Sequence, residues 1–269
     1  MPSPLARVRS LVPRRLRRAL RHLSNLGFKP YLTAMAVGDC RFRFWIADRV
    51  GQAWYLGNQS LSPEIVFTRA MLHLDDVVFE VGAHHGFMTL QLAQMVGPNG
   101  IVVAFEASPH NAEILGRNLA ANAVTNVTVE AQAVGATVGR ASISQDYNAS
   151  VVVTGDAQRE VGLTTLDTFA HLRPTMLKID VEGYEVEVLR GARAILATRP
   201  GLAIEVHVRE LAQYGHTPAD VVAFIDREWY SIWLQADGRS DPKPYDGGEI
   251  AEAEQVHLYA VPKQVRLAS

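Results

Sequence analysis

Carboxylates follow apolar stretches of the sequence that are typical of buried β-strands. Glu80, Glu106 and Asp180 each stand at or near the end of such a stretch. Continuous runs of β-forming residues are typical of strands buried on both faces of a parallel sheet. Open α/β sheets bind their ligands at the carboxyl ends of these strands. The sequence therefore predicts an α/β fold with acidic side chains along the ligand-binding edge of its sheet.

A glycine turn follows the first of these carboxylates. Gly82 and Gly86 lack a Cβ atom, so the backbone can turn tightly and let a ligand approach, and the helix predicted after them points its amides at the turn. A dinucleotide loop would need glycine at His84 and Phe87, and a P-loop would need a Gly-Lys-Ser/Thr ending. The remaining pattern, acidic-x-Gly-x-x-x-Gly, is similar to the loop of S-adenosylmethionine-dependent methyltransferases, whose carboxylate suits the cationic methionyl end. An ordinary strand-to-helix turn is the alternative.

Glu106 is placed to bind a ribose. It lies 26 positions after Glu80, at the end of the second predicted strand. An acid at this place accepts hydrogen bonds from both ribose hydroxyls of an adenosine ligand. Farther along, Gln132 or Ala133 is expected to contact the adenine, with a plain loop into the next strand as the alternative.

The most specific stretch is Leu-Lys-Ile-Asp-Val-Glu-Gly-Tyr-Glu at residues 177–185. It places Asp180 and Glu182 at the carboxyl edge of a strand, where bunched carboxylates raise a pKa or attract a cation. The next strand, residues 202–207, ends in His207 at the same edge. We predict His207 as general base, with Asp180 orienting it or acting as the base itself.

Composition limits the class of protein. The chain has 269 residues, 48% hydrophobic and 20% charged, which is ordinary for a globular protein of one or two domains. The single Cys40 excludes internal disulfides and Cys-rich zinc sites and favours a reducing compartment. Neither a transmembrane run nor the apolar region of a signal peptide is found. We expect a cytoplasmic protein.

Charge is distributed unevenly along the chain. Residues 1–30 carry seven arginines and Lys29 without an acid. A basic arm of about +8 therefore precedes a body of about −10. Leu16, Leu20 and Leu23 have helical spacing, so we expect the arm to form an amphipathic helix. This helix either lies on an anionic membrane or glycolipid surface, at the inner membrane face, or packs on the domain. Nucleic acid is not an expected partner, because the body is acidic and no aromatic stacking motif accompanies the arginines.

Periodicity and turn signals predict the other elements. They are a β-hairpin over residues 37–58, helices over 63–72, 109–121, 184–190 and 218–227, a third strand at 127–129, closing strands at 230–235 and 255–261, a loop or short hairpin at 146–162 and a loop at 237–248.

Several segments together resemble the FkbM-type methyltransferases. They are Glu-Val-Gly-Ala-His-His-Gly at 80–86, Ala-Phe-Glu-Ala-Ser-Pro at 104–109, Thr-Leu-Asp at 165–167, the stretch at 177–185, Val-Leu-Arg-Gly-Ala at 188–192 and Glu-Val-His at 205–207. The resemblance covers about residues 60–210. The family usually has Asp at the position of Glu80 and Asn at that of His84. Glu80 keeps the charge on a longer arm, whereas His84 could shift the methionyl contact.

The resemblance implies the Rossmann-like fold of class I methyltransferases. This is a seven-stranded, mostly parallel sheet of order 3-2-1-4-5-7-6 with strand 7 antiparallel. We divide the chain into residues 1–60, a basic helix and hairpin extension, and residues 61–269, the S-adenosylmethionine-binding domain.

The resemblance also implies S-adenosylmethionine as cofactor, S-adenosylhomocysteine as product, and O-methylation of a hydroxyl on a sugar, glycolipid or natural product. Glu80, Gly82 and Gly86 would hold the methionyl end and Glu106 the ribose. The full set expected to contact the cofactor is Glu80, Gly82, Ala83, His84, Gly86, Glu106, Ala107, Gln132, Ala133 and Asp180.

Other interpretations stay open. We assign no metal, although a divalent ion held by Asp180, Glu182 and His207 is an alternative. A nucleotide-dependent oxidoreductase on the same fold is disfavoured by His84 and Phe87. A non-catalytic, membrane-associated binding module is disfavoured by the strand-end carboxylates and the two glycines.

The acceptor is expected to be a small molecule, glycan or glycolipid. Its contacts are expected from residues 37–60, 146–162 and 237–250. There the aromatic side chains of Trp54, Tyr147 and Trp233 could stack on a sugar or fill gaps.

Overall fold

The computed structural model describes residues 27–57, 61–144, 151, 159–236, 240–248, 250, 255–264 and 267. The predicted helix of the basic arm and Tyr147 lie outside these residues. Within the described ranges, no helix combines the length and the apolar composition that crossing a membrane requires.

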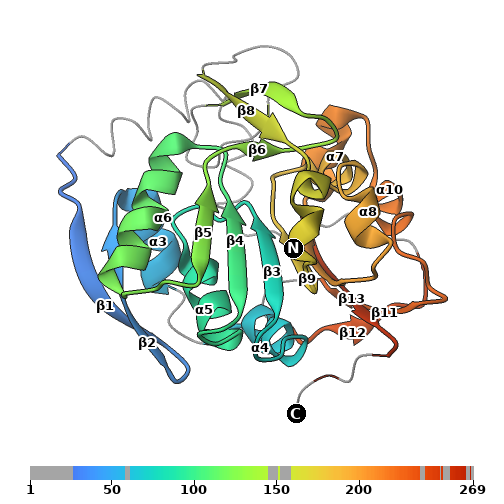
Figure 1. Cartoon of the computed structure of the whole chain (residues 1–269), viewed down its shortest axis with the longest axis horizontal. Coiled ribbons are helices and arrows are strands. Elements are labelled where there is room, and N and C mark those ends of the chain that lie inside the picture. The colour runs from blue at the N-terminus through green and yellow to red at the C-terminus, as the bar shows by residue number, and fades with distance from the viewer. Residues whose placement is uncertain are drawn as a thin grey trace, which may run out of the picture.

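An eight-stranded sheet forms the middle of the described chain (Figure 1). Its order is β12-β11-β13-β10-β9-β3-β4-β5. The strands are Val77–Val81 (β3), Ile101–Phe105 (β4), Val127–Glu130 (β5), Met176–Ile179 (β9), Gly201–Val206 (β10), Tyr230–Gln235 (β11), Lys243–Pro244 (β12) and Val256–Pro262 (β13).

Seven of these strands follow the predicted order 3-2-1-4-5-7-6. The strands from β5 to β10 pair in parallel, and β13 is the antiparallel strand 7 between β10 and β11. The predicted count is wrong by one, because β12 pairs with the outer edge of β11. Its two residues lie in the stretch that the turn signals assigned to a loop.

Helices cover both faces of the sheet, because alternate side chains of its buried strands point to opposite faces. Phe79 and Leu177 face one layer, which comprises Leu166–Leu172 (η1), Glu185–Arg190 (α7), Arg193–Leu196 (α8) and Pro218–Val222 (α10). Val78 and Ala104 face the other layer, which comprises Pro63–Ala70 (α4), Phe87–Met95 (α5) and Pro109–Ala121 (α6). Val208–Leu211 (α9) and Ala212–Tyr214 (η2) follow β10.

Serine side chains cap two of these helices. The hydroxyl of Ser108 accepts the amide of Asn111 at the start of α6, whose bounds match the prediction. Ser62 does the same for Ile65 in α4. The predictions that α4 reaches residue 72 and that α10 reaches residue 227 are wrong, since these helices end at Ala70 and Val222.

The predicted hairpin over residues 37–58 is wrong in its second half. The hairpin consists of Tyr31–Val37 (β1) and Cys40–Ile46 (β2), and Arg49–Gly57 forms a helix, α3. The carboxylate of Asp48 accepts the Gly51 amide at 2.6 Å, which is the contact of a helix N-cap. Asp48 thus begins a helix, and the aromatic residues beyond it, which were predicted as a strand, belong to α3.

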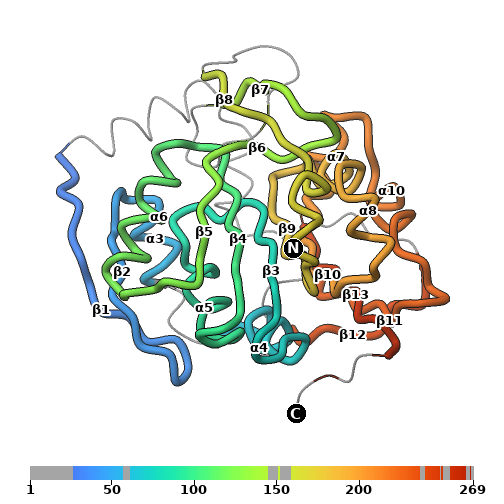
Figure 2. The backbone as a smooth tube through the Cα atoms, in the orientation of Figure 1, coloured from blue at the N-terminus to red at the C-terminus, as the bar shows by residue number. Residues whose placement is uncertain are grey.

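A separate three-stranded sheet was not predicted. Ala133–Val134 (β6), Gly139–Ile143 (β7) and Arg159–Thr164 (β8) pair in the order β6-β8-β7. In the tube view this sheet follows β5 along the chain and lies beyond one end of the central strands (Figure 2). Residues 159–162 are therefore strand, as the hairpin alternative for residues 146–162 allowed, while most of the segment before them is outside the described residues.

Asn118 of α6 and Asn122, the C-cap of that helix, attach the hairpin. Asn118 is fully buried, accepts the Trp45 amide at 2.6 Å and donates to the His85 carbonyl at 2.7 Å, so it joins β2 to the glycine loop. Asn122, one turn later, accepts from and donates to the exposed backbone of Arg43, both at 2.7 Å.

Asn118→Ala should lower the free energy of unfolding by at least about 2 kcal/mol, because each buried group left without a partner costs about 1–3 kcal/mol. Asn122→Ala is the matched control and should cost less than about 1 kcal/mol, since water can replace its hydrogen bonds. Chemical denaturation measures both changes. Equal losses in the two variants would contradict the role of Asn118.

Candidate active site

A cavity of about 640 Å³ opens at the carboxyl ends of β3, β4, β9 and β10. It is lined by ten of the residues that the sequence predicted, namely Glu80, Gly82, Ala83, His84, Glu106, Ala107, Gln132, Ala133, Asp180 and His207. Gly86 is the predicted contact that the lining does not include.

The two loop glycines serve the shape of the loop. Gly82 has φ +90°, and a Cβ atom there would collide with the carbonyl oxygen of Asp180. Gly86 has φ +87° as the residue before α5, and a Cβ atom there would collide with Leu115 of α6. Both positions therefore need glycine, because a side chain would separate the loop from the elements packed on it.

Glu106 lies directly after β4 and is buried. Its Oε2 accepts the His84 amide at 2.8 Å, and its Oε1 accepts the Ser108 amide at 2.8 Å and the Asn111 side chain at 3.4 Å. Burial raises the pKa of Glu106 to about 7, although these hydrogen bonds favour the carboxylate. A carboxylate offers about four acceptor positions, so capacity remains for a ligand hydroxyl.

Glu80 is the buried carboxylate of the glycine loop. The Thr89 hydroxyl of α5 donates to it at 2.6 Å. Burial raises the pKa of Glu80 to about 7 against this hydrogen bond and against the charge of Lys178. A cationic ligand group beside it would favour the charged form.

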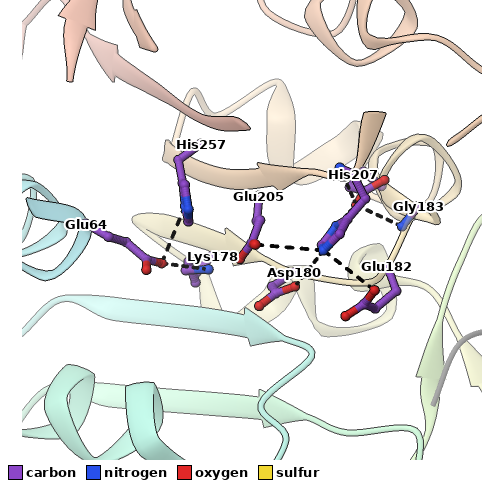
Figure 3. Close-up of polar contacts among 9 residues, drawn as sticks. Glu64, Lys178, Asp180, Glu182, Gly183, Glu205, His207 and His257 are labelled. Atoms are coloured by element: carbon purple, nitrogen blue, oxygen red, sulfur yellow. Dashed lines mark hydrogen bonds and ion pairs between the residues drawn. The ribbon is translucent and has the colours of Figure 1, made fainter. Parts of the chain in front are cut away.

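His207 stands at the start of α9 amid carboxylates from β9, β10 and α7 (Figure 3). Its Nδ1 lies 2.8 Å from Oε1 of Glu185, whose side chain is fully buried. Its Nε2 lies 3.8 Å from Oδ1 of Asp180, 3.7 Å from Oε2 of Glu182 and 3.8 Å from Oε1 of Glu205. Asp180, Glu182 and His207 lie together in the structure, as predicted. The residue that holds the imidazole ring of His207 by a hydrogen bond, however, is Glu185.

The charges of this cluster shift one another's pKa. Burial alone would lower the pKa of His207, but Glu185, Asp180 and Glu182 raise it to about 10. Desolvation and the carboxylate of Glu205 raise the pKa of Asp180 to about 7. The cluster thus favours any added positive charge.

A second group of charged side chains, Glu64, Lys178 and His257, lies beside the His207 cluster. Contact among these three residues was not predicted. Nζ of the buried Lys178 is 3.2 Å from Oε1 of Glu64 in α4, and Nδ1 of His257 in β13 is 3.8 Å from the same oxygen (Figure 3). Burial alone would raise the pKa of Glu64, but Lys178 and His257 hold it below its ordinary value. A glutamate is also common in the first turn of a helix, where Glu64 lies. The local sequence therefore did not indicate its contact with Lys178.

Aromatic side chains of α3 form another part of the lining. The Tyr55 hydroxyl and Nδ1 of His84 form a hydrogen bond, and the Trp54 ring lies 5.5 Å from the His84 ring. Trp54 and Tyr55 both line the cavity. Trp233, which was predicted beside Trp54 as a stacking candidate, packs against Phe67 at 5.5 Å instead.

The family profile described as "Methyltransferase FkbM domain" matches residues 80–232, more than half of the chain. The chain belongs to the FkbM methyltransferase family. Membership of this family favours a methyltransferase over the oxidoreductase and the non-catalytic module.

Solved structures with similarity to the chain are also methyltransferases. The FkbM methyltransferase from Methylobacillus flagellatus KT is 21% identical, with a TM-score of 0.47 over 74% of this chain and 47% of that one. A S-adenosylmethionine-dependent O-methyltransferase from Thermotoga maritima is 13% identical, with a TM-score of 0.44 over 87% of this chain and 79% of that one. The chain thus spans about half the length of the first of these proteins. No curated protein matches it.

Gly82→Ala should destabilise the protein by more than about 2 kcal/mol, because it adds both left-handed strain and the collision with Asp180. Gly116→Ala is the control: it lies inside α6 with open space around its Cβ position and should stabilise by up to about 1 kcal/mol. Thermal or chemical unfolding of both variants measures the difference. A Gly82→Ala protein as stable as wild type would contradict the close approach.

Proposed function

We propose that this methyltransferase transfers a methyl group from S-adenosylmethionine to a hydroxyl of a sugar, glycolipid or natural-product acceptor, within the cavity at the carboxyl edge of the sheet. One observation carries the proposal. A single cavity joins the glycine loop and Glu106, which suit the donor, to the Asp180–His207 cluster, which suits a hydroxyl.

The donor side of the cavity fits S-adenosylmethionine. When bound, this cofactor supplies an electrophilic methyl group on a sulfonium. Glu106 would accept from the ribose hydroxyls with its remaining lone pairs. Glu80 and the loop at Gly82, Ala83 and His84 would serve the cationic methionyl end, since a buried carboxylate gains most from a cation.

The remaining residues predicted to contact the donor line the same cavity, except Gly86. Ala107 follows Glu106 directly, Asp180 meets the glycine loop, and Gln132 and Ala133 would border the adenine. Gly86 would act through the shape of the loop.

A hydroxyl is a poor nucleophile near neutral pH and must lose its proton during transfer. With a pKa of about 10, His207 can take that proton only in its neutral form, which is the minor form at neutral pH, and only at Nε2, because Glu185 occupies Nδ1. Asp180 exposes 37% of its side chain against 6% for His207 and receives the proton where the ring is already protonated. The pair would thus position and deprotonate the acceptor beside the donor.

The acceptor's chemistry is suggested by the rest of the lining. Trp54 offers a flat apolar surface, and Glu64, Lys178 and His257 offer hydrogen-bonding groups, a combination suited to a polyhydroxylated ring. For a glycolipid acceptor, the basic arm at residues 1–26 would add contact with an anionic membrane surface.

Calorimetric titration with S-adenosylhomocysteine tests the donor site. Glu106→Gln should weaken binding about tenfold or more at pH 8, since it removes a charged acceptor of hydrogen bonds. Glu113→Gln, an exposed carboxylate of α6 paired with Arg117, is the matched control and should bind as wild type does. Absence of binding to the wild type would contradict the proposed function.

The same titration should depend on pH. With the pKa of Glu106 at about 7, the carboxylate predominates above pH 7 and is lost as the pH falls through it. Wild-type affinity should therefore fall several-fold from pH 8 to pH 6, and the fall should be smaller in Glu106→Gln. An undiminished pH effect in the variant would assign it to another group.

Turnover is measured by transfer of a labelled methyl group to a panel of glycans, glycolipids and hydroxylated natural products. His207→Ala should reduce kcat at least about 100-fold and leave S-adenosylhomocysteine binding unchanged. His216→Ala, whose ring pairs with Glu187 outside the cavity, should retain turnover. Near-normal turnover in His207→Ala would exclude His207 from the chemistry.

A further inference from the structure

Three side chains at the carboxyl edge present ligand atoms to one point. Asp180 follows β9, Glu205 lies in β10, and His207 follows it. One oxygen or nitrogen from each lies within 4.8 Å of the others, and this is the one such group among the residues that the structure describes. All three also line the cavity.

The spacing of these atoms suits an ion better than direct contacts. Nε2 of His207 is 3.8 Å from an oxygen of Asp180 and 3.8 Å from one of Glu205, beyond hydrogen-bond distance. An ion about 2.1 Å from each ligand separates neighbouring ligand atoms by about 3 to 4 Å. Nε2 thus points from a side chain that is only 6% exposed into a gap of the right size.

The carboxylates of Asp180 and Glu205 come from adjacent strands, and one oxygen of each lies within 4.8 Å of the other. Two ionised carboxylates at such a distance repel unless a proton or a cation is shared. Lys178 is engaged by Glu64 at 3.2 Å, and Glu182 adds a further negative charge at 3.7 Å from Nε2.

The support behind His207 is that of a metal-binding histidine. Glu185 is fully buried, takes the Gly183 amide at 3.0 Å, and holds Nδ1 at 2.8 Å. In metal sites a carboxylate commonly holds the second ring nitrogen in this way, which fixes the tautomer and directs the other nitrogen at the ion.

We propose that Asp180, Glu205 and His207 bind a divalent cation, of the class of Mg²⁺ or Mn²⁺, whose open coordination positions face the cavity. Two carboxylates with one imidazole suit such hard or borderline ions. The ligand set differs from the one considered on the sequence, since Glu205 takes the place of Glu182.

The role of the ion rests on the proposed function. A cation at this place would act on the acceptor hydroxyl as a Lewis acid and lower its pKa. His207 would then act as a ligand, and the proton of the hydroxyl would pass to the carboxylate of Glu182, which lines the cavity 3.7 Å from Nε2 and is not a ligand.

Mn²⁺ binding is measured on the full-length chain after chelator treatment and dialysis, by calorimetry and by electron paramagnetic resonance. We expect one saturable site per chain. Pulsed resonance of the wild type should detect a coupled histidine nitrogen, which tests the ligand set without any variant.

Glu205→Gln and Asp180→Asn should each weaken Mn²⁺ binding at least about tenfold, the lower limit seen even for outer-shell changes. Glu187→Gln, a carboxylate of α7 paired with Arg190 and His216, is the matched control and should bind Mn²⁺ as wild type does. Circular dichroism confirms that each variant is folded.

Absence of saturable Mn²⁺ binding, or binding without a coupled nitrogen, would overturn the proposal. These outcomes are distinct from failure of the proposed function. Binding of S-adenosylhomocysteine without Mn²⁺ binding, with turnover that resists chelator, would leave His207 as the base. Mn²⁺ binding without S-adenosylhomocysteine binding would keep the ion site and remove the methyl donor.

Discussion

The contact between the ends of β3 and β9 is the constraint on which the site depends. The Asp180 amide donates to the Val81 carbonyl at 2.9 Å, and the carbonyl of Asp180 occupies the space where Gly82 would carry a Cβ atom. The loop after β3 and the acidic stretch after β9 can therefore meet without an intervening side chain. Because of this approach, groups suited to the donor and groups suited to the acceptor share one cavity.

The cavity brings several buried charged groups together. Burial raises the pKa of Glu80, Glu106 and Asp180 to about 7 each, so the ionised forms are held at a cost. Cationic or hydrogen-bonding ligands would recover part of that cost, since they favour the carboxylates. We therefore expect the buried carboxylates at this edge to contribute little to the free energy of unfolding when no ligand is bound.

The sequence predicted the parts of this arrangement that depend on local patterns. Continuous apolar runs located β3, β4 and β10, and periodicity and turn signals located α6, whose bounds match the prediction. The order of the seven main strands came from the resemblance to a family. Strand-end position was enough to place Glu106, Asp180 and His207 at one edge.

Contacts between distant segments could not be predicted from the same patterns. Glu64 and His257 reach Lys178 from α4 and β13, and each is compatible with an ordinary role in its own element. Glu185 lies in the first turn of α7, where an acidic residue is common, so its position alone did not predict its hydrogen bond to His207. The cap at Asp48 is a local signal that the sequence does contain. Because it was not used, α3 was predicted as a strand and the position of Tyr55 in the cavity was not predicted.

A crystal structure of the protein with S-adenosylhomocysteine tests the central claim most directly. The account predicts the ribose hydroxyls within hydrogen-bond distance of Glu106 and the homocysteine end beside Gly82, with its sulfur facing the Asp180–His207 cluster. A ligand bound elsewhere, or a ribose away from Glu106, would contradict it.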